Sequence, residues 1–338
     1  MQKIIHGDCL EEMRKMADNS IDCIVTDPPY GIAFMGKDWD KALPSIDIWK
    51  EALRIAKPGT HMLVAGLPRM IHRMICSIED AGWEVRDLLM HLFGQGFPKS
   101  HNFGKKMEER WHGYGTVLKP AWEGWVLFMK PLEGTFAQNA EKWGVGGLNI
   151  DGSRIGTIVE TWPATRAYCR SQPGAPSKGK QSCGDPPPGR WPANLILDEE
   201  ATEMLDEQSG LAASRFFYCA KASPSERNAG LEGMPLKDSP FGENRENGNG
   251  LGMKGKQMLP RNNFHPTVKP LTLMQYLLKL VMPPNPDAII LDPFAGSGTT
   301  ILAAKQLGFN AIGIEKEKEY VEIADNRIIK NDKRIHSH

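Results

Sequence analysis

The chain has 338 residues, of which 41% are hydrophobic and 24% are charged, a balance typical of a globular protein. Its 41 basic and 41 acidic residues cancel, which argues against a protein that coats nucleic acid non-specifically. No apolar run reaches the roughly 20 residues that a membrane span needs, and no signal-peptide pattern opens the chain, so we expect a cytoplasmic protein. The six cysteines show no CxxC spacing, so neither a zinc site nor a disulfide framework is expected.

Apolar runs and amphipathic stretches alternate along the first part of the chain. The pattern predicts strands at residues 3–6, 21–25, 60–65, 83–93 and 123–129. It predicts helices at 10–16, 46–56 and 68–80, the second of them ending at Lys57-Pro58-Gly59. Such alternation indicates βαβ units and therefore an α/β fold with a mostly parallel sheet covered on both faces.

The alternation stops between about residues 149 and 264, where Pro, Gly, Ser and Asn are frequent. Only 195–197 and 215–219 read as strands there, and 199–205 as a helix. The part beyond Leu231 could be a disordered linker, although long loops in compact domains are more often functional. Regular patterns then resume, with helices at 271–280, 299–307 and 320–329 and strands at 288–291 and 310–314. We therefore expect a catalytic domain in two parts, 1–148 and 262–338, separated by an inserted region, 149–261.

The tetrapeptide Asp27-Pro28-Pro29-Tyr30 directly follows the strand at 21–25. The Asp27 carboxylate and the Pro28 carbonyl can accept the two hydrogens of an exocyclic amine on a nucleobase, which frees the nitrogen lone pair for attack. Pro28 and Pro29 fix the backbone, and Tyr30 offers an aromatic face for stacking. These four are the candidate catalytic residues, and the alternative is an ordinary β-turn.

A glycine-containing loop follows the strand at 288–291. Gly296 and Gly298 allow a tight turn into a helix, whose N-terminus suits a nucleoside-containing cofactor. The strict dinucleotide fingerprint is absent, because a third glycine at the right offset is missing. Together with Asp27, the candidate cofactor-binding residues here are Asp292, Pro293, Phe294, Ala295, Gly296, Ser297, Gly298 and Thr299.

Two further strand ends carry acidic residues that can serve the same cofactor. Glu315, followed by Lys316, ends the strand at 310–314, where a carboxylate can accept from both ribose hydroxyls; the alternative is a surface glutamate. Asp8 follows the first strand and could accept from an adenine amine, with the Cys9 N–H meeting a ring nitrogen. Asp8 could also cap the helix that follows, and the two roles are compatible.

A base inside a duplex cannot reach such a site, so the target must be flipped or single-stranded. The segment 31–40 follows Tyr30 and could form a flap over the base, with Lys37 and Trp39 as candidate DNA contacts, although Trp39 could equally be an ordinary packing residue. Between residues 161 and 184 the chain has no acidic residue. The candidate DNA contacts in that stretch are Arg166, Arg170, Lys178 and Lys180.

The tetrapeptide, the FxGxG loop at 294–298 and the hexapeptide His265-Pro266-Thr267-Val268-Lys269-Pro270 together resemble the amino-group DNA methyltransferases that use S-adenosylmethionine. Their order resembles that of the β class, and the resemblance covers about residues 1–150 and 262–330. It implies a Rossmann-like sheet with one antiparallel strand, a permuted strand order and an inserted recognition region. In such a sheet the strands before Asp8, Phe294 and Glu315 are neighbours. It also implies that Thr267 and Lys269 contact the cofactor and that His265 supports them.

The stretches 189–195 and 216–223 look like segments of bacterial and phage site-specific methyltransferases. This likeness implies that 149–261 is the target-recognition region, with Arg190 among its DNA contacts and double-stranded DNA as the partner. We expect modification without cleavage, as by the methyltransferase of a restriction-modification system. Relatives of this class often form dimers, so a homodimer is left open.

The tetrapeptide DPPY is commoner among adenine-N6 enzymes, which makes adenine the expected target and cytosine-N4 the alternative. RNA and protein methyltransferases with related sites usually carry the cofactor loop before the PPY motif, and the order here is the reverse. A non-catalytic DNA-binding protein is a further alternative. The presence of Asp27, Tyr30, Gly296 and Glu315 argues against it.

Overall fold

The computed structural model describes residues 1–32, 40–94, 96, 100–101, 103, 108–156, 189–220, 231 and 268–330. Eight of the predicted contacts lie outside these described residues, namely Lys37, Trp39, Arg166, Arg170, Lys178, Lys180, His265 and Thr267. Within the described ranges, no helix combines the length and the apolar character needed to cross a membrane.

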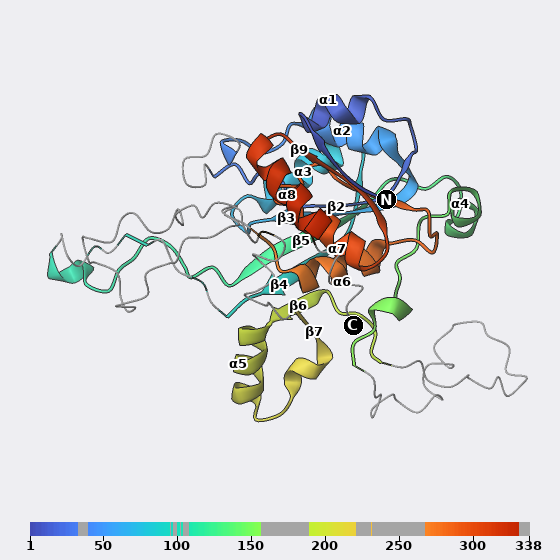
Figure 1. The fold of residues 1–338 in the computed structure, drawn as a ribbon. Coiled ribbons are helices and arrows are strands. Elements are labelled where there is room, and N and C mark those ends of the chain that lie inside the picture. Colours follow the sequence, from blue (N-terminus) through green and yellow to red (C-terminus); the bar gives the residue numbers. More distant parts are fainter. Residues whose placement is uncertain are drawn as a thin grey trace, which may run out of the picture.

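One mixed sheet runs through the described part of the chain (Figure 1). Its strands are β1 (Gln2–His6), β2 (Ile21–Thr26), β3 (Ala56–Gly66), β4 (Glu84–Leu92), β5 (Trp122–Met129), β6 (Leu195–Asp198), β7 (Tyr218–Ala220), β8 (Ile289–Asp292) and β9 (Asn310–Glu315). Their order in the sheet is β1-β9-β8-β2-β3-β5-β4-β6-β7. Only β5 runs antiparallel to its neighbours, β3 and β4. The prediction of a mostly parallel sheet with one antiparallel strand is confirmed.

Helices cover both faces of this sheet. They are α1 (Cys9–Arg14), α2 (Ile46–Ile55), α3 (Ile71–Asp80), α4 (Phe136–Trp143), α5 (Glu199–Ser209), α6 (Leu271–Val281), α7 (Thr299–Gln306) and α8 (Lys318–Lys330). Helices α1, α2 and α3 pack in one group, and α6, α7 and α8 pack in another. The connection through α2 moves along the sheet in the direction opposite to the connection through α7, so right-handed crossovers place the two groups on opposite faces.

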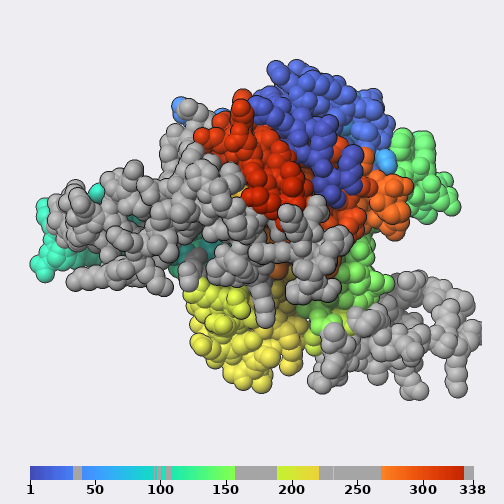
Figure 2. Space-filling view, in the orientation of Figure 1, coloured from blue at the N-terminus to red at the C-terminus, as the bar shows by residue number. Residues whose placement is uncertain are grey.

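The two ends of the described chain meet in the sheet. Strand β1 pairs in parallel with β9, and His6 lies opposite Glu315. Strand β9 pairs in turn with β8. Figure 2 shows the resulting surface, on which the blue N-terminal and red C-terminal segments adjoin. The prediction that the strands before Asp8, Phe294 and Glu315 are neighbours is therefore confirmed.

The centre of the sheet is apolar because it is covered from both sides. All six residues of β2 are buried, which explains why this strand reads as a continuous apolar run rather than an alternating one. Its single carboxylate, Asp22, is paired with Lys57 at 2.5 Å and accepts from the Ile289 N–H at 2.8 Å. The strand that precedes Asp27 is thus firmly held by its neighbours.

Two local predictions were wrong, and one helix was not predicted. Residues 57–59 belong to β3 instead of ending a helix, because a register shift between β2 and β3 accommodates them. The predicted strand at 215–219 begins later, because residues 213–216 form a 3-10 turn ahead of β7. Hydrogen bonds from the Ser214 N–H and hydroxyl to the Asp206 carboxylate stabilise this turn. Helix α4 was not predicted, although Thr135 and Gln138 form a capping box at its start.

The described strands of the inserted region continue the same sheet. Strand β6 pairs in parallel with β4, and β7 pairs with β6. Helix α5 and these two strands project below the rest of the sheet in Figure 1. The division of the chain at residues 149 and 261 stays a prediction.

Candidate active site

Four neighbouring parallel strands end in acidic residues at one edge of the sheet. In sheet order, Asp8 follows β1, Glu315 ends β9, Asp292 ends β8 and Asp27 follows β2. Ligands of open α/β sheets bind outside the carboxyl ends of the strands. The candidate cofactor and catalytic residues therefore gather where the fold class predicts a ligand.

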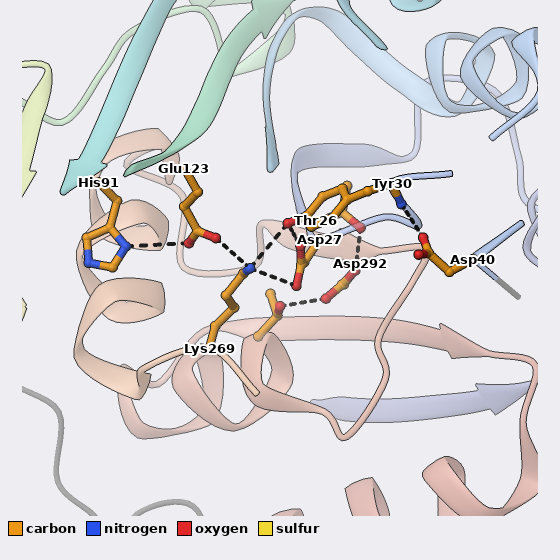
Figure 3. A network of polar contacts seen from close by, with 9 residues as sticks. Thr26, Asp27, Tyr30, Asp40, His91, Glu123, Lys269 and Asp292 are labelled. Atoms are coloured by element: carbon orange, nitrogen blue, oxygen red, sulfur yellow. Dashed lines mark hydrogen bonds and ion pairs between the residues drawn. The ribbon is translucent and has the colours of Figure 1, made fainter. Parts of the chain in front are cut away.

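Asp292 joins the two sequence motifs directly (Figure 3). Its carboxylate accepts from the Thr26 hydroxyl at 2.7 Å, the Thr300 hydroxyl at 2.5 Å and the Phe294 N–H at 3.1 Å. Burial raises the pKa of Asp292 to about 6. Because Thr26 precedes Asp27, this carboxylate ties the tetrapeptide to the glycine loop; a cofactor contact by Asp292 itself stays a prediction.

The glycine loop adopts the backbone that its sequence predicts. Gly296 and Gly298 have φ values of +53° and +75°, in the left-handed region that favours glycine. The buried Arg327 of α8 donates to the Ser297 carbonyl at 2.7 Å and to the Ser297 and Thr299 hydroxyls at 3.0 Å. Ser297 and Thr299 thus face the interior, while Gly296 is more accessible. No pattern in the sequence indicated a role for Arg327, which lies on a helix with an ordinary amphipathic pattern.

Glu315 braces the same loop. Its carboxylate accepts from the Gly296 N–H at 2.8 Å and from the Glu317 N–H at 2.7 Å. Burial raises its pKa, and the two hydrogen bonds counteract that effect. A carboxylate has about four acceptor positions, so Glu315 keeps capacity for the hydroxyls of a ribose.

Replacing Glu315 by alanine is expected to weaken cofactor binding by about 10- to 100-fold, since hydrogen bonds to a charged group contribute about 1.5–3 kcal/mol. Isothermal titration with S-adenosylmethionine measures the change. Glu317→Ala is the matched control, because its side chain is exposed and its backbone N–H remains to bond Glu315. If the two variants bind the cofactor with equal affinity, Glu315 does not contact it.

Asp8 caps α1, as one of its two predicted roles requires. Its carboxylate accepts from the Leu10 N–H at 3.0 Å, and the Lys316 ammonium lies 3.5 Å from it. Burial raises the pKa of the Cys9 thiol to about 12, so the thiol stays protonated. The adenine contact of Asp8 stays a prediction.

The tetrapeptide is held in place by a residue that the sequence interpretation missed. The Asp40 carboxylate accepts from the N–H groups of Tyr30 and Gly31 at 2.6 and 3.1 Å. Asp commonly accepts backbone N–H groups in turns, and this preference was the available signal. The Tyr30 hydroxyl donates to Asp27 Oδ1, and burial raises the pKa of Tyr30 well above its usual value.

Lys269 was predicted as a cofactor contact, and the structure places its ammonium beside the tetrapeptide (Figure 3). Lys269 Nζ lies 3.2 Å from Asp27 Oδ2 and 2.9 Å from Glu123 Oε2, and it donates to the Tyr30 hydroxyl oxygen at 3.2 Å. Burial would lower the pKa of Lys269, but Asp27 and Glu123 raise it well above its usual value. Lys269 therefore stays charged between two carboxylates.

Glu123 and His91 complete this network, and neither was among the predicted site residues. Glu123 lies at the start of β5, and His91 Nδ1 is 3.4 Å from its Oε1. Burial would raise the pKa of Glu123, but Lys269 and His91 lower it to about 2. A charged residue at the head of an otherwise apolar strand was the only sequence signal.

A cavity of about 360 Å³ lies beside the network. Lys269, Glu123 and His91 line it together with Phe93 of the loop after β4 and Asp198 of β6. The walls thus come from the catalytic sheet and from the inserted region.

Arg190, the one predicted DNA contact among the described residues, lies in the inserted region. Its guanidinium donates to the Arg215 carbonyl at 3.2 Å and sits 5.0 Å from the centroid of the Phe216 ring. Arg215 lies over the same ring at 5.1 Å, so basic and aromatic groups gather at this point. Its contact with DNA stays a prediction.

Comparison with known proteins identifies the family. Residues 21–326 match the N6_N4_Mtase model, described as DNA methylase. A stretch of 65 residues is 51% identical to the Type II methyltransferase M.HindIII of Haemophilus influenzae, and it covers 19% of this chain and 20% of that protein. Another of 68 residues is 47% identical to the Type II methyltransferase M2.LlaDCHI of Lactococcus lactis subsp. cremoris, covering 20% and 24%. The chain thus spans a quarter or less of these curated relatives.

One solved structure has a comparable fold. The PvuII DNA methyltransferase (cytosine-N4-specific) aligns with a TM-score of 0.53 and 16% identity, over 98% of this chain and 88% of that one. At this identity the likeness shows the fold alone. The family model, in contrast, covers most of the chain and includes the tetrapeptide, Lys269 and the glycine loop. The chain belongs to the N6_N4_Mtase family of DNA methylases.

Proposed function

We propose that this protein transfers a methyl group from S-adenosylmethionine to an exocyclic amine in double-stranded DNA, with adenine N6 as the target. One observation carries the proposal above the others. The tetrapeptide and the glycine loop lie on adjacent strands, and the Thr26 hydroxyl connects them through Asp292. A methyl donor held by the loop would therefore lie next to a base held by Asp27.

The residues at the ends of β1, β9 and β8 fit this cofactor. Glu315 has free acceptor positions for ribose hydroxyls, and Asp8 stands on the neighbouring strand. The N-terminus of α7 adds backbone donors. When bound, S-adenosylmethionine supplies a methyl group on a positively charged sulfur.

The tetrapeptide prepares the amine for this group. Asp27 accepts one amine hydrogen and the Pro28 carbonyl accepts the other, so the nitrogen lone pair turns away from the ring and becomes available. Tyr30 stacks on the base and fixes its orientation. The rate then derives from positioning and electrostatics, without a covalent intermediate on the enzyme.

Tritium-labelled S-adenosylmethionine tests the proposal. We expect label to enter unmethylated phage DNA and neither tRNA nor bulk protein. Chromatography of the digested nucleosides is expected to yield N6-methyladenine; N4-methylcytosine would correct the base while keeping the reaction. Sequencing of the methylated DNA then reads the recognition motif. Label in RNA or protein, or no transfer at all, would contradict the proposal.

The rate is expected to depend on pH through Asp27, which must be ionised to accept from the amine. Burial raises the pKa of Asp27 above the ordinary value of 3.8, although Lys269 counteracts this. Because its pKa is raised, Asp27 becomes protonated at a higher pH than an exposed aspartate does. We therefore expect kcat/KM, which reports the free enzyme, to decline on an acidic limb above pH 3.8. In Lys269→Met the limb should move to higher pH, and an unmoved limb would contradict this assignment.

A further inference from the structure

Both carboxylate oxygens of Asp27 already have partners in this structure. Tyr30 donates to Oδ1, and Lys269 lies 3.2 Å from Oδ2. The proposed function requires this same carboxylate to accept from the target amine. Each oxygen keeps a second acceptor position, but an ammonium beside Oδ2 competes with the target amine for the same carboxylate. The inference below rests on the proposed function.

Lys269 is the partner that competes most directly with the target. Its nitrogen donates to oxygens of Tyr30 and Glu123 and contacts Asp27, the acceptor proposed for the target amine. The side chains of Lys269, Asp27 and Glu123 are only 13%, 19% and 12% exposed, so water does not screen the ammonium strongly. Lys269 thus holds a place that an incoming amine needs.

Glu123 offers the ammonium a second place. It is the nearer carboxylate, at 2.9 Å from Lys269 Nζ against 3.2 Å for Asp27. Its low pKa keeps it charged, and His91 fixes its other oxygen. Lys269 therefore can leave Asp27 without losing an ionic partner, which avoids the large cost of an unpaired buried charge.

The cavity beside the network gives this movement room. Lys269, Glu123 and His91 line it, and about 360 Å³ is ample for the end of a lysine side chain. His91 is 5% exposed, and its Nε2 has no hydrogen-bond partner among the described residues. In Figure 3, Nδ1 is the ring nitrogen that faces Glu123 and Lys269, and Nε2 lies on the far side of the ring, so Glu123 is the group that receives the ammonium.

We propose that Lys269 is a positioning residue with two places, on Asp27 in the base-free enzyme and on Glu123 beside His91 when the target base is bound. In the first place it keeps Asp27 charged and prevents two buried carboxylates from repelling each other. In the second it frees Asp27 Oδ2 for the amine. Glu123 thereby determines how readily the target base enters the site. Lys269 determines whether the Asp27 carboxylate is charged.

The test uses a duplex that carries the recognition motif with 2-aminopurine in place of the target adenine, whose fluorescence rises when the base leaves the stack. Glu123→Gln is expected to reduce the fluorescence gain and to raise the KM for DNA about tenfold, a typical coupling between charged neighbours. Lys269→Met is expected to keep the full fluorescence gain while its kcat falls at least about tenfold. When Lys269 is already replaced by Met, adding Glu123→Gln should not reduce the fluorescence gain further, because no ammonium remains for Glu123 to bind.

The exposed pair Lys142 and Glu133, with side chains 57% and 51% exposed, supplies the control. Lys142→Met, Glu133→Gln and their combination are expected to change neither fluorescence nor turnover. Urea unfolding verifies that each variant is folded; Lys269→Gln replaces Lys269→Met if the latter is not. Equal effects of Glu123→Gln with and without Lys269 would overturn the proposal. Absence of methylation by the wild-type enzyme would instead overturn the proposed function.

Discussion

Replacing Asp27 by alanine is expected to lower the kcat of methyl transfer by about 10²- to 10³-fold, the loss found when one pre-organised electrostatic group is removed from an active site. Without its carboxylate, nothing at this position accepts from the amine and draws its lone pair out of the ring. Single-turnover transfer of labelled methyl groups to DNA measures the effect. Cofactor affinity is expected to fall much less than turnover, because the proposed function assigns most contacts with that ligand to Glu315 and the glycine loop.

The matched control is Asp47→Ala, which removes an exposed carboxylate from α2. We expect it to methylate DNA at the wild-type rate. Asp27→Ala is also expected to retain DNA binding in a gel-shift assay. An Asp27→Ala variant with near wild-type turnover would refute the mechanism, since the acceptor would then lie elsewhere.

Replacing Gly298 by alanine is expected to lower the free energy of unfolding by about 2–5 kcal/mol, from left-handed strain of about 1–2 and overpacking of about 1–3. The residue has φ of +75°, and an added Cβ would lie 2.7 Å from the Cβ of Ala324 in α8. Relief of this clash requires α8 to move away from the loop. We therefore expect cofactor binding to weaken as well, and urea unfolding with and without S-adenosylmethionine measures both effects.

Gly308→Ala separates strain from clash. Gly308 has φ of +76°, but nothing lies within 4 Å of an added Cβ. We expect this variant to lose only the strain energy, about 1–2 kcal/mol, and to bind cofactor normally. Equal losses at the two positions would show that the contact with Ala324 is relieved at no cost.

Local sequence features were sufficient to predict the backbone conformation of both motifs. The two prolines end β2 because they lack the N–H that a ladder needs, and the left-handed glycines force the turn after β8. Apolar runs bounded by such residues predicted nearly every strand of the catalytic sheet. The order of the motifs along the chain predicted the pairing of β1 with β9, because a parallel sheet of this class needs those strands as neighbours.

The amino-acid sequence by itself determined the conformation of the glycine loop and the strands that bring it beside Asp27, the proposed acceptor, since each depends on a short stretch of chain. Only the tertiary structure decided what surrounds the acceptor. Lys269 lies 239 positions from Tyr30 and 146 from Glu123, and the three meet through the order and register of the sheet. Asp40 and Arg327 likewise act through partners that burial selects for them. Which distant charged side chains pair with each other depends on which of them the packed core buries away from water. Local sequence propensities carry no information about this.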